Sequence, residues 1–421
     1  MRRDRLGYLD FGRKASPAAA RSEIPVVPQR PARPRWLDRF ERSLGGQLVE
    51  GPEGTRLVVR RWHAKDEVYG ARRLADFLTV PRQAMGWLGR DASLAEVDPA
   101  SVVFVDCETT GLASGTGTKA FLVGLAYFDQ HGFHVEQHFL PDYDAERSFL
   151  AGVDAALSRA GCLVSFNGKC FDLPLLETRL ALLGQWADWL DLPHLDLLYP
   201  ARRLWRRRLE SCSLTALEEH VLGTARAGDV PGWLIPSLYF DFLRTGDLAS
   251  LEPVFEHNRR DLLSLVALVC RLSRLLSREE EPDHPLDYVG LGRMLEALGE
   301  TERGIEVYQR ALAYDLEPGD RDEVQARLGF VYKRLRRDKQ ALDAWSAVAR
   351  SVGGRSILAL VELAKHYEHR TRDYARAAEV TRQALATRAL WPEVTAVGGE
   401  ATAEALERRL RRLERRLLAR R

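Results

Sequence analysis

The sequence lacks the features that mark membrane-bound and secreted proteins. None of its 421 residues lies in an uninterrupted apolar run near the ~18 residues that a membrane span needs. The basic N-terminus is not followed by the apolar stretch of a signal peptide. The five cysteines are odd in number and include no CxxC pair, which excludes a disulfide framework. We therefore expect a soluble protein of the reducing cytoplasm, with no membrane contact.

Lysine is also scarce, because only seven of the 62 Lys and Arg residues are lysine. The formal net charge is +2, yet both ends are basic: residues 1–40 hold ten basic and four acidic residues, and residues 401–421 hold eight and three. Arginine is so abundant that an arginine run alone is weak evidence for phosphate binding. The run RRLWRRR (202–208) suits either phosphate contacts with base stacking on Trp205 or an ordinary solvated face.

The pattern of prolines and apolar residues divides the chain into five parts. They are a basic, Pro-rich disordered leader (1–36), a lead-in region packed on the next domain (37–99), an α/β domain (100–277), helical repeats (285–390) and a basic amphipathic helix (401–421). Within the lead-in region we expect a short strand near residue 60 and a helix over 68–80.

The α/β part begins with three segments rich in β-branched and aromatic residues, at 101–106, 119–129 and 133–141. A tight connection joins the second and third, so we predict a three-strand meander. A helix, a short buried strand and a second helix follow, and two further helices come later. These are expected at 144–160, 162–167, 172–184, 213–223 and 253–276. A meander followed by βα units predicts a mixed α/β sheet.

After Pro285 the chain repeats itself with a period near 37 residues. Leu291-Gly292 and Tyr308 recur as Leu328-Gly329 and Trp345, and a third, weaker unit follows. Small residues stand where paired helices approach closely, and the aromatic residues fill the gap, which resembles a tetratricopeptide array. Ordinary helical hairpins are the alternative. The leucine stripe of the last helix predicts that it either caps the array or binds phosphate.

The string VVFVDCETTGL (102–112) carries the most chemistry. Strand periodicity places Asp106 and Glu108 on one face and Cys107 on the other. Two carboxylates in one small volume repel each other unless a divalent cation compensates, and Mg²⁺ or Mn²⁺ prefers hard oxygen ligands. An isolated D-x-E is also typical of a surface pair, so other residues must decide.

Two further motifs supply additional candidate metal-site residues. Asp172 opens a helix after FNGKCF, where a simple helix N-cap is the alternative role. His257 and Asp261 stand at i and i+4 on one helix, where a surface ion pair is the alternative. Taken together, four carboxylates and a histidine on a strand, a helix start and a late helix are the components of a two-metal phosphodiesterase site.

The order D-x-E-T-T-G-L, F-N-G-x-x-F-D-x-P and a His/Asp helix is similar to the DEDD group of 3′→5′ exonucleases, which have a ribonuclease H-like fold. The sequence resembles most the YprB family of bacterial ribonuclease H-like proteins. The segments that carry this resemblance are 115–128, 229–243 and 257–268, together with the tetratricopeptide-like region. The resemblance implies an α/β ribonuclease H-like domain followed by an all-α tetratricopeptide-like array.

The resemblance also implies roles for individual residues. The metal ligands of two Mg²⁺ or Mn²⁺ ions would be Asp106, Glu108, Asp172 and Asp261. His257 would be the catalytic base, although it precedes Asp261 by four residues, a spacing more typical of members with a tyrosine there. Further residues would contact the terminal nucleotide or a substrate phosphate: Thr109, Thr110, Gly111, Leu112, Asn167 and Lys169.

The sequence thus predicts a metal-dependent 3′→5′ exonuclease that hydrolyses DNA in bacterial DNA repair, with single-stranded or duplex ends as substrate. The helical repeats would dock a helicase. An endonuclease or ribonuclease with the same site is the alternative within this reaction class, because nothing in the sequence reports on the 2′-OH. A non-catalytic nucleic-acid-binding adaptor is the alternative of another class.

Overall fold

The computed structural model describes residues 34–111, 117–226, 228–351, 356–390 and 401–419. Most of the predicted leader lies outside the described residues. A mixed seven-stranded sheet forms the centre of the N-terminal part, in the order β1-β2-β7-β6-β5-β8-β9. The strands are β1 (Gly46–Gly51), β2 (Gly54–His63), β5 (Val102–Thr109), β6 (Ala120–Phe128), β7 (Phe133–Phe139), β8 (Cys162–Ser165) and β9 (His194–Asp196).

The predicted meander is present, because β5, β6 and β7 pair antiparallel in sequence order. On the other side of β5, strands β8 and β9 run parallel to it, as βα units require. The lead-in region contributes more than packing: β1 and β2 extend the same sheet beyond β7. The helix predicted over 68–80 is wrong. That segment forms a two-stranded hairpin, Val68–Tyr69 with Arg72–Arg73, and then a 3-10 helix, Leu74–Thr79.

Helices cover both faces of the sheet. The long helix α8 packs on the face that carries Phe104, and α3, α4 and α7 pack on the face that carries Val105. This split follows from the two-residue alternation of β5. The helices of this part are α1 (Arg35–Leu44), α2 (Arg82–Gly89), α3 (Glu146–Leu157), α4 (Asp172–Leu182), α5 (Leu198–Trp205), α6 (Leu214–Leu217), α7 (Ile235–Thr245) and α8 (Glu252–Ser277).

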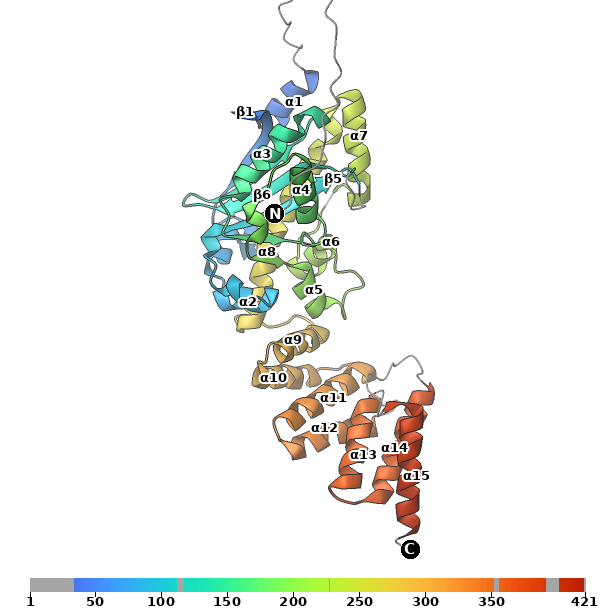
Figure 1. Cartoon of the computed structure of the whole chain (residues 1–421). Coiled ribbons are helices and arrows are strands. Elements are labelled where there is room, and N and C mark those ends of the chain that lie inside the picture. The colour runs from blue at the N-terminus through green and yellow to red at the C-terminus, as the bar shows by residue number, and fades with distance from the viewer. Residues whose placement is uncertain (1–33, 112–116, 227, 352–355, 391–400, 420–421) are drawn as a thin grey trace, which may run out of the picture.

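An all-helical array follows and extends from the end of the α/β part that carries α2 and α5, with α1 at the opposite end (Figure 1). The predicted α/β fold followed by helices is therefore confirmed. The array comprises α9 (Pro285–Ala297), α10 (Thr301–Leu312), α11 (Pro318–Arg334), α12 (Asp338–Arg350), α13 (Ile357–His369), α14 (Tyr374–Leu390) and α15 (Ala403–Leu418).

The helices pair as the repeat predicts, α9 with α10, α11 with α12, and α13 with α14. A Cβ at Gly292 would lie 2.5 Å from the Tyr308 ring, and a Cβ at Gly329 would lie 2.1 Å from the Trp345 indole. The same glycine-to-aromatic contact thus recurs at the same offset in two units. This contact supports the tetratricopeptide-like interpretation, which stays a prediction.

The last helix, α15, packs on α14 through its leucine stripe, with Leu406 and Leu413 fully buried. Three arginines of α15 (Arg409, Arg412 and Arg416) form ion pairs with the buried Glu368 of α13. Of the two roles predicted for this helix, the contacts support the cap. Across the described residues, no helix combines the length and apolarity needed to cross a membrane.

Helix α9 fastens the array to the α/β part. Leu291, Met294 and Leu295 of α9 belong to the same apolar cluster as α5 and α8. At Gly290 the two backbones touch, because a Cβ there would lie 2.2 Å from the Leu204 carbonyl oxygen. A buried ion pair between Arg208 and Asp287, at 3.2 Å, lies beside this contact.

Replacing Gly290 by alanine should therefore loosen the junction. The clash is with backbone, which cannot rotate away, so we expect a loss of about 1–3 kcal/mol in the free energy of unfolding. Gly304→Ala is the matched control, because the nearest atom to its Cβ would be 3.6 Å away. Thermal unfolding of both variants tests this. Equal melting temperatures for Gly290→Ala and wild type would show that the junction is not tightly packed.

Candidate active site

The end of β5 presents the first two carboxylates. Asp106 and Glu108 lie on the α8 face, two and four residues after Phe104, while Cys107 packs on the opposite face. A β-bulge between Glu108 and Thr109 ends the regular pairing with β6. The bulge changes the direction of the strand directly after the acidic pair.

The third carboxylate, Asp172, is the first residue of α4, and Phe171 occupies the N-cap position. The Asp172 carboxylate accepts no hydrogen bond from the described residues, so the N-cap role that the sequence left open is not the one observed. Gly168 brings the preceding loop close, because a Cβ there would lie 3.1 Å from Asp172 Oδ2. Asp172 is thus a buried carboxylate, 9% exposed, without a donor of its own.

Helix α8 supplies His257 and Asp261 from one face, with His257 Nε2 3.6 Å from Asp261 Oδ2. The other ring nitrogen, Nδ1, lies 2.9 Å from Asp229 Oδ1. Burial works against ionisation of Asp229, but the hydrogen bond with His257 holds its pKa below the usual value. An ionised carboxylate on Nδ1 fixes the ring and leaves Nε2 directed toward Asp261.

The predicted carboxylates perturb one another electrostatically. Burial, then Asp261 and Asp172, raise the pKa of Asp106 well above its usual value. Burial and the same neighbours, with Asp106 added, raise the pKa of Glu108. Burial, Asp196 and Asp261 raise the pKa of Asp172 to about 7. The structure therefore brings the four carboxylates close enough to interact, in one partly buried, anionic region.

Arg226 supplies the positive charge within this region. Its guanidinium forms ion pairs with Asp261 and Glu218, and it lies 3.0 Å from Asp229. Its side chain is 4% exposed, and Glu218 is fully buried on a π-helical turn, Glu218–Leu222. Burial lowers the pKa of Arg226, but the partnering carboxylates outweigh it and the net shift is upward. A π-helical turn at such a place is typical of functional sites.

The donor set fits divalent cations that prefer oxygen. Carboxylate oxygens are the ligands of Mg²⁺ and Mn²⁺. Burial and then neighbouring carboxylates raise the pKa values of Asp106, Glu108 and Asp172, and bound cations would offset both effects. In the part of the chain that the structure describes, no three His, Cys, Asp or Glu side chains yet converge tightly enough to enclose a metal ion. One of the four, Asp261, is held by Arg226 instead.

Asn258 positions Asp106. Its Nδ2 donates to Asp106 Oδ2 at 2.8 Å, and its Oδ1 accepts from Gln137 Nε2 at 2.8 Å. Both amides are fully buried between α8 and the sheet. Gly124 of β6 makes the space, because a Cβ there would lie 2.2 Å from Asn258 Oδ1.

Replacing Asn258 by alanine should release Asp106. We expect a roughly 10–100-fold loss of metal affinity or activity, the usual effect of removing a partner of a ligand. The free energy of unfolding should fall by about 1–3 kcal/mol, because the buried Gln137 amide loses one of its two acceptors and keeps only the Phe255 carbonyl. Gly124→Ala, which displaces Asn258 without removing it, should act in the same direction. Mn²⁺ titration and nuclease assays measure the loss of affinity and activity, and thermal unfolding measures the loss of stability. Wild-type values for Asn258→Ala would show that Asp106 needs no such partner.

The residues predicted to contact substrate lie around this region, but several serve the local fold. Thr109 Oγ1 donates to the Gly111 carbonyl at 2.8 Å, and Thr110 Oγ1 accepts from the Lys119 backbone. The space beside Gly111 is open. Leu112 lies outside the described residues.

The loop after β8 is organised by the buried Asp196. Its carboxylate accepts from the backbone N–H groups of Asn167 at 2.7 Å, Lys169 at 3.1 Å and Leu198 at 3.1 Å. Asp196 thus holds the loop after β8 and the first backbone N–H group of α5. Lys169 is exposed, and its charge acts on Asp91 and His194 among the groups outside the carboxylate set. The base-stacking role considered for Trp205 is wrong, because this side chain is 1% exposed.

Four functional candidates were missed from the sequence: Arg226, Asn258, Asp229 and Glu218. Asn258 and Asp229 stand within the segments 257–268 and 229–243 that carry the family resemblance, so the signal was present but assigned no role. Arg226 carries no such signal, because one arginine among so many is inconspicuous. Glu218 could be found only by knowing that its helix is buried.

Comparison with known proteins gives the class of the fold. The model of the RNase_H superfamily matches residues 103–273, which span β5 to α8 and contain all four carboxylates and His257. A structure of the family B DNA polymerase from the hyperthermophilic archaeon Pyrobaculum calidifontis is similar with a TM-score of 0.35 and 16% sequence identity. That match covers 49% of this chain and 28% of the polymerase chain.

The sheet, the helices on its two faces and the acidic residues at the end of β5 define a protein with a ribonuclease H-like nuclease domain. The chain is 32% identical over 333 residues to "Uncharacterized protein YprB" of Bacillus subtilis (strain 168). This alignment covers 77% of this chain and 78% of that protein. The chain belongs to the YprB family.

Proposed function

We propose that this protein is a divalent-metal-dependent 3′→5′ exonuclease that hydrolyses phosphodiester bonds of DNA. One observation carries the proposal: Asp106, Glu108, Asp172 and Asp261 share one partly buried region, where burial and then the charges of neighbouring carboxylates raise the pKa values of the first three. Such a region is costly without cations. In a ribonuclease H-like nuclease domain, the cations that offset this repulsion would also promote hydrolysis of a phosphodiester.

The four carboxylates would hold two Mg²⁺ or Mn²⁺ ions, with Asn258 orienting Asp106. When bound, these cations supply charge stabilisation at the scissile phosphate and at the leaving 3′-oxygen. The chain contributes the rest. The loop from Thr109 to Leu112, with Asn167 and Lys169, would seat the terminal nucleotide.

His257 is the proposed base. Its Nδ1–H donates to Asp229, so Nε2 is left to accept a proton from the attacking water. The water oxygen then bonds to phosphorus, the bond between phosphorus and the 3′-oxygen breaks, and the 3′-oxygen leaves with the electron pair. The Asp229 partner explains how a histidine at this spacing keeps a fixed orientation.

His257→Ala should lower turnover by roughly 10²–10⁴-fold, the usual contribution of a general base. Metal binding should persist, because His257 is not a ligand in this proposal. His257→Gln is the conservative comparison, and His220, which stands on the neighbouring helix and is exposed, provides the control His220→Ala. Single-turnover rates with Mn²⁺ titration measure both quantities. Unchanged turnover would remove His257 from the mechanism.

We further propose a role in DNA repair in the cytoplasm, with a helicase docked on the helical array. The family resemblance motivates the repair role and the partner. All five cysteines are free thiols, which fits a reducing compartment. Co-purification of the full chain with a helicase, and its loss when the array surface is altered, tests the partner.

Oligonucleotides blocked at the 3′ end or at the 5′ end, with Mn²⁺ or Mg²⁺, test the activity. A 3′→5′ exonuclease shortens the 5′-blocked strand one nucleotide at a time and leaves the 3′-blocked strand intact. Cleavage of a closed DNA circle would indicate an endonuclease, and faster hydrolysis of RNA would indicate a ribonuclease. No hydrolysis of any substrate, with no thermal stabilisation by metal, would favour a non-catalytic adaptor.

A further inference from the structure

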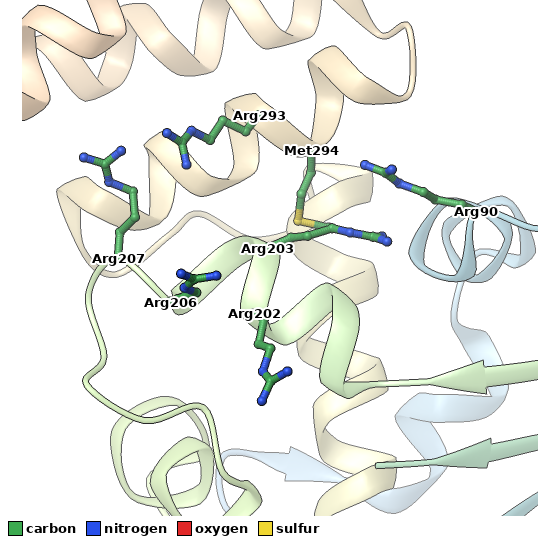
Figure 2. A pocket seen from close by; sticks show the side chains of 7 residues that line it. All are labelled: Arg90, Arg202, Arg203, Arg206, Arg207, Arg293 and Met294. Atoms are coloured by element: carbon green, nitrogen blue, oxygen red, sulfur yellow. The ribbon is translucent and has the colours of Figure 1, made fainter. Parts of the chain in front are cut away.

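A second charged site lies between the α/β part and the array. A cavity of about 520 Å³ opens between the end of α2, helix α5 and helix α9 (Figure 2). The residues that line it are Arg90, Arg202, Arg203, Arg206, Arg207, Arg293 and Met294. All but the methionine are arginines, and we refer to this cavity as the arginine cleft. Among the described residues, no carboxylate lines it.

Two of the six arginines form ion pairs with carboxylates of this chain. Arg207 forms ion pairs with Asp320 and Glu323 of α11, and Arg293 forms one with Glu323. These ion pairs tie the segment after α5, and helix α9, to α11. The charge of these two arginines is therefore structural.

The other four guanidiniums have no carboxylate partner among the described residues: Arg90, Arg202, Arg203 and Arg206. Burial lowers the pKa of Arg203, and the nearby charge of Arg90 lowers it further. Its one hydrogen bond is a long one, 3.5 Å from Nη1 to the Leu88 carbonyl. Cations gathered without counter-charge repel one another, so an anion in the cleft would relieve the repulsion.

The cleft is held open by the fold. Its α5 and α9 walls touch at Gly290 and Leu204, where no Cβ could be accommodated, and the buried Arg208–Asp287 pair lies alongside. A site whose walls are fixed before binding loses little conformational entropy on binding.

The loop that precedes Asp172 connects the acidic site to the neighbourhood of the cleft. Lys169 lies in the loop between β8 and α4, and its positive charge helps to lower the pKa of Asp91, the residue after Arg90. On the other side, Asp196 anchors both that loop and the start of α5, the helix that presents Arg202 and Arg203. An eight-residue helix is about 12 Å long. At about 3.4 Å per phosphate along one strand, that length corresponds to roughly four nucleotides.

We propose that the arginine cleft binds the phosphate backbone of a nucleic-acid strand whose 3′ end lies among the carboxylates. This inference rests on the proposed function. The guanidinium fork matches phosphate oxygens, and several forks in one cleft match successive phosphates of a chain. Because Trp205 is buried, the cleft offers no aromatic platform from that run, so it binds the backbone without reading bases.

The test uses full-length Asp172→Asn protein in EDTA, so that binding is measured without hydrolysis. Fluorescence anisotropy gives the Kd for oligothymidylates of about five and about twenty nucleotides, below and above the reach of the cleft. The double variant Arg202→Glu/Arg206→Glu should bind the long strand about 10–100-fold more weakly. The slope of log Kd against log salt should fall by about 1.4, for two lost phosphate contacts on a single strand. The preference for the long strand should largely disappear.

The double variant Arg35→Glu/Arg42→Glu makes the same charge change on exposed positions of α1, at the far end of the α/β part (Figure 1). It should leave the long-strand Kd within about twofold of the parent. Arg90→Glu, from a different element, should weaken binding in the same direction as the α5 variant, which guards against a local folding defect in α5.

Wild-type affinity of the α5 variant for the long strand, or an equal loss in the α1 variant, would overturn the proposal. Displacement of the strand by inorganic phosphate at constant ionic strength would show a single-anion site, and equal displacement by polyglutamate would show a site for acidic protein. Either result contradicts strand binding. Because no metal is present, a failure of the nuclease proposal would appear in the hydrolysis assays and leave these binding results unchanged.

Discussion

Replacing Asp172 by asparagine should lower hydrolysis of DNA by about 10³-fold or more, because one ligand of the proposed cations loses its charge. The change is nearly isosteric, and Asp172 accepts no hydrogen bond from the described residues, so the fold should be preserved. Quantified release of end-labelled nucleotide in Mn²⁺ measures the loss.

Asp188→Asn is the matched control, because Asp188 is an exposed aspartate in the same part of the chain. Its activity should equal that of wild type. If Asp172→Asn digests DNA at the wild-type rate while circular dichroism shows an intact fold, the hydrolysis does not depend on the carboxylate cluster.

In EDTA the same Asp172→Asn variant should be more stable than wild type above pH 7. Burial and the neighbouring Asp196 and Asp261 raise the pKa of Asp172 from 3.8 to about 7 in the folded chain. Between about pH 4 and pH 7 the folded state therefore binds more protons than the unfolded state, and the free energy of unfolding falls as pH rises. The full shift corresponds to roughly 4 kcal/mol at pH 8.

Thermal unfolding at several pH values measures this difference. The two curves should converge below about pH 4, where Asp172 of the wild type is protonated in both the folded and the unfolded state. Adding Mn²⁺ at pH 8 should reverse the order, because cation binding to the folded state stabilises wild type more than the variant. A variant less stable than wild type in EDTA at pH 8 would contradict the electrostatic account of the site.

Strand alternation and helix periodicity were sufficient to predict much of this molecule. The positions of Asp106 and Glu108 follow from the two-residue period of β5, and the pairing of His257 with Asp261 follows from the four-residue step of a helix. The meander followed because each strand is a continuous run of β-forming residues. Long-range sheet assembly has no such local signal, so the addition of β1 and β2 next to β7 could not be predicted.

The polar residues that complete the site were hidden for a different reason. Asn258 and Gln137 are functional because they are buried, and burial depends on Gly124 admitting α8 against the sheet. Arg226 reaches three carboxylates from a segment without periodicity. The segment 68–80 was wrongly predicted to be a helix from its local apolar pattern. It forms a hairpin instead, and that hairpin packs against α8.

The most direct test of the central claim is an anomalous difference map from crystals of the full chain grown with Mn²⁺. The account predicts two manganese peaks within coordination distance of the carboxylates of Asp106, Glu108, Asp172 and Asp261, with Arg226 no longer paired to Asp261. Peaks bound elsewhere, or no peak beside these carboxylates while Arg226 remains on Asp261, would contradict it.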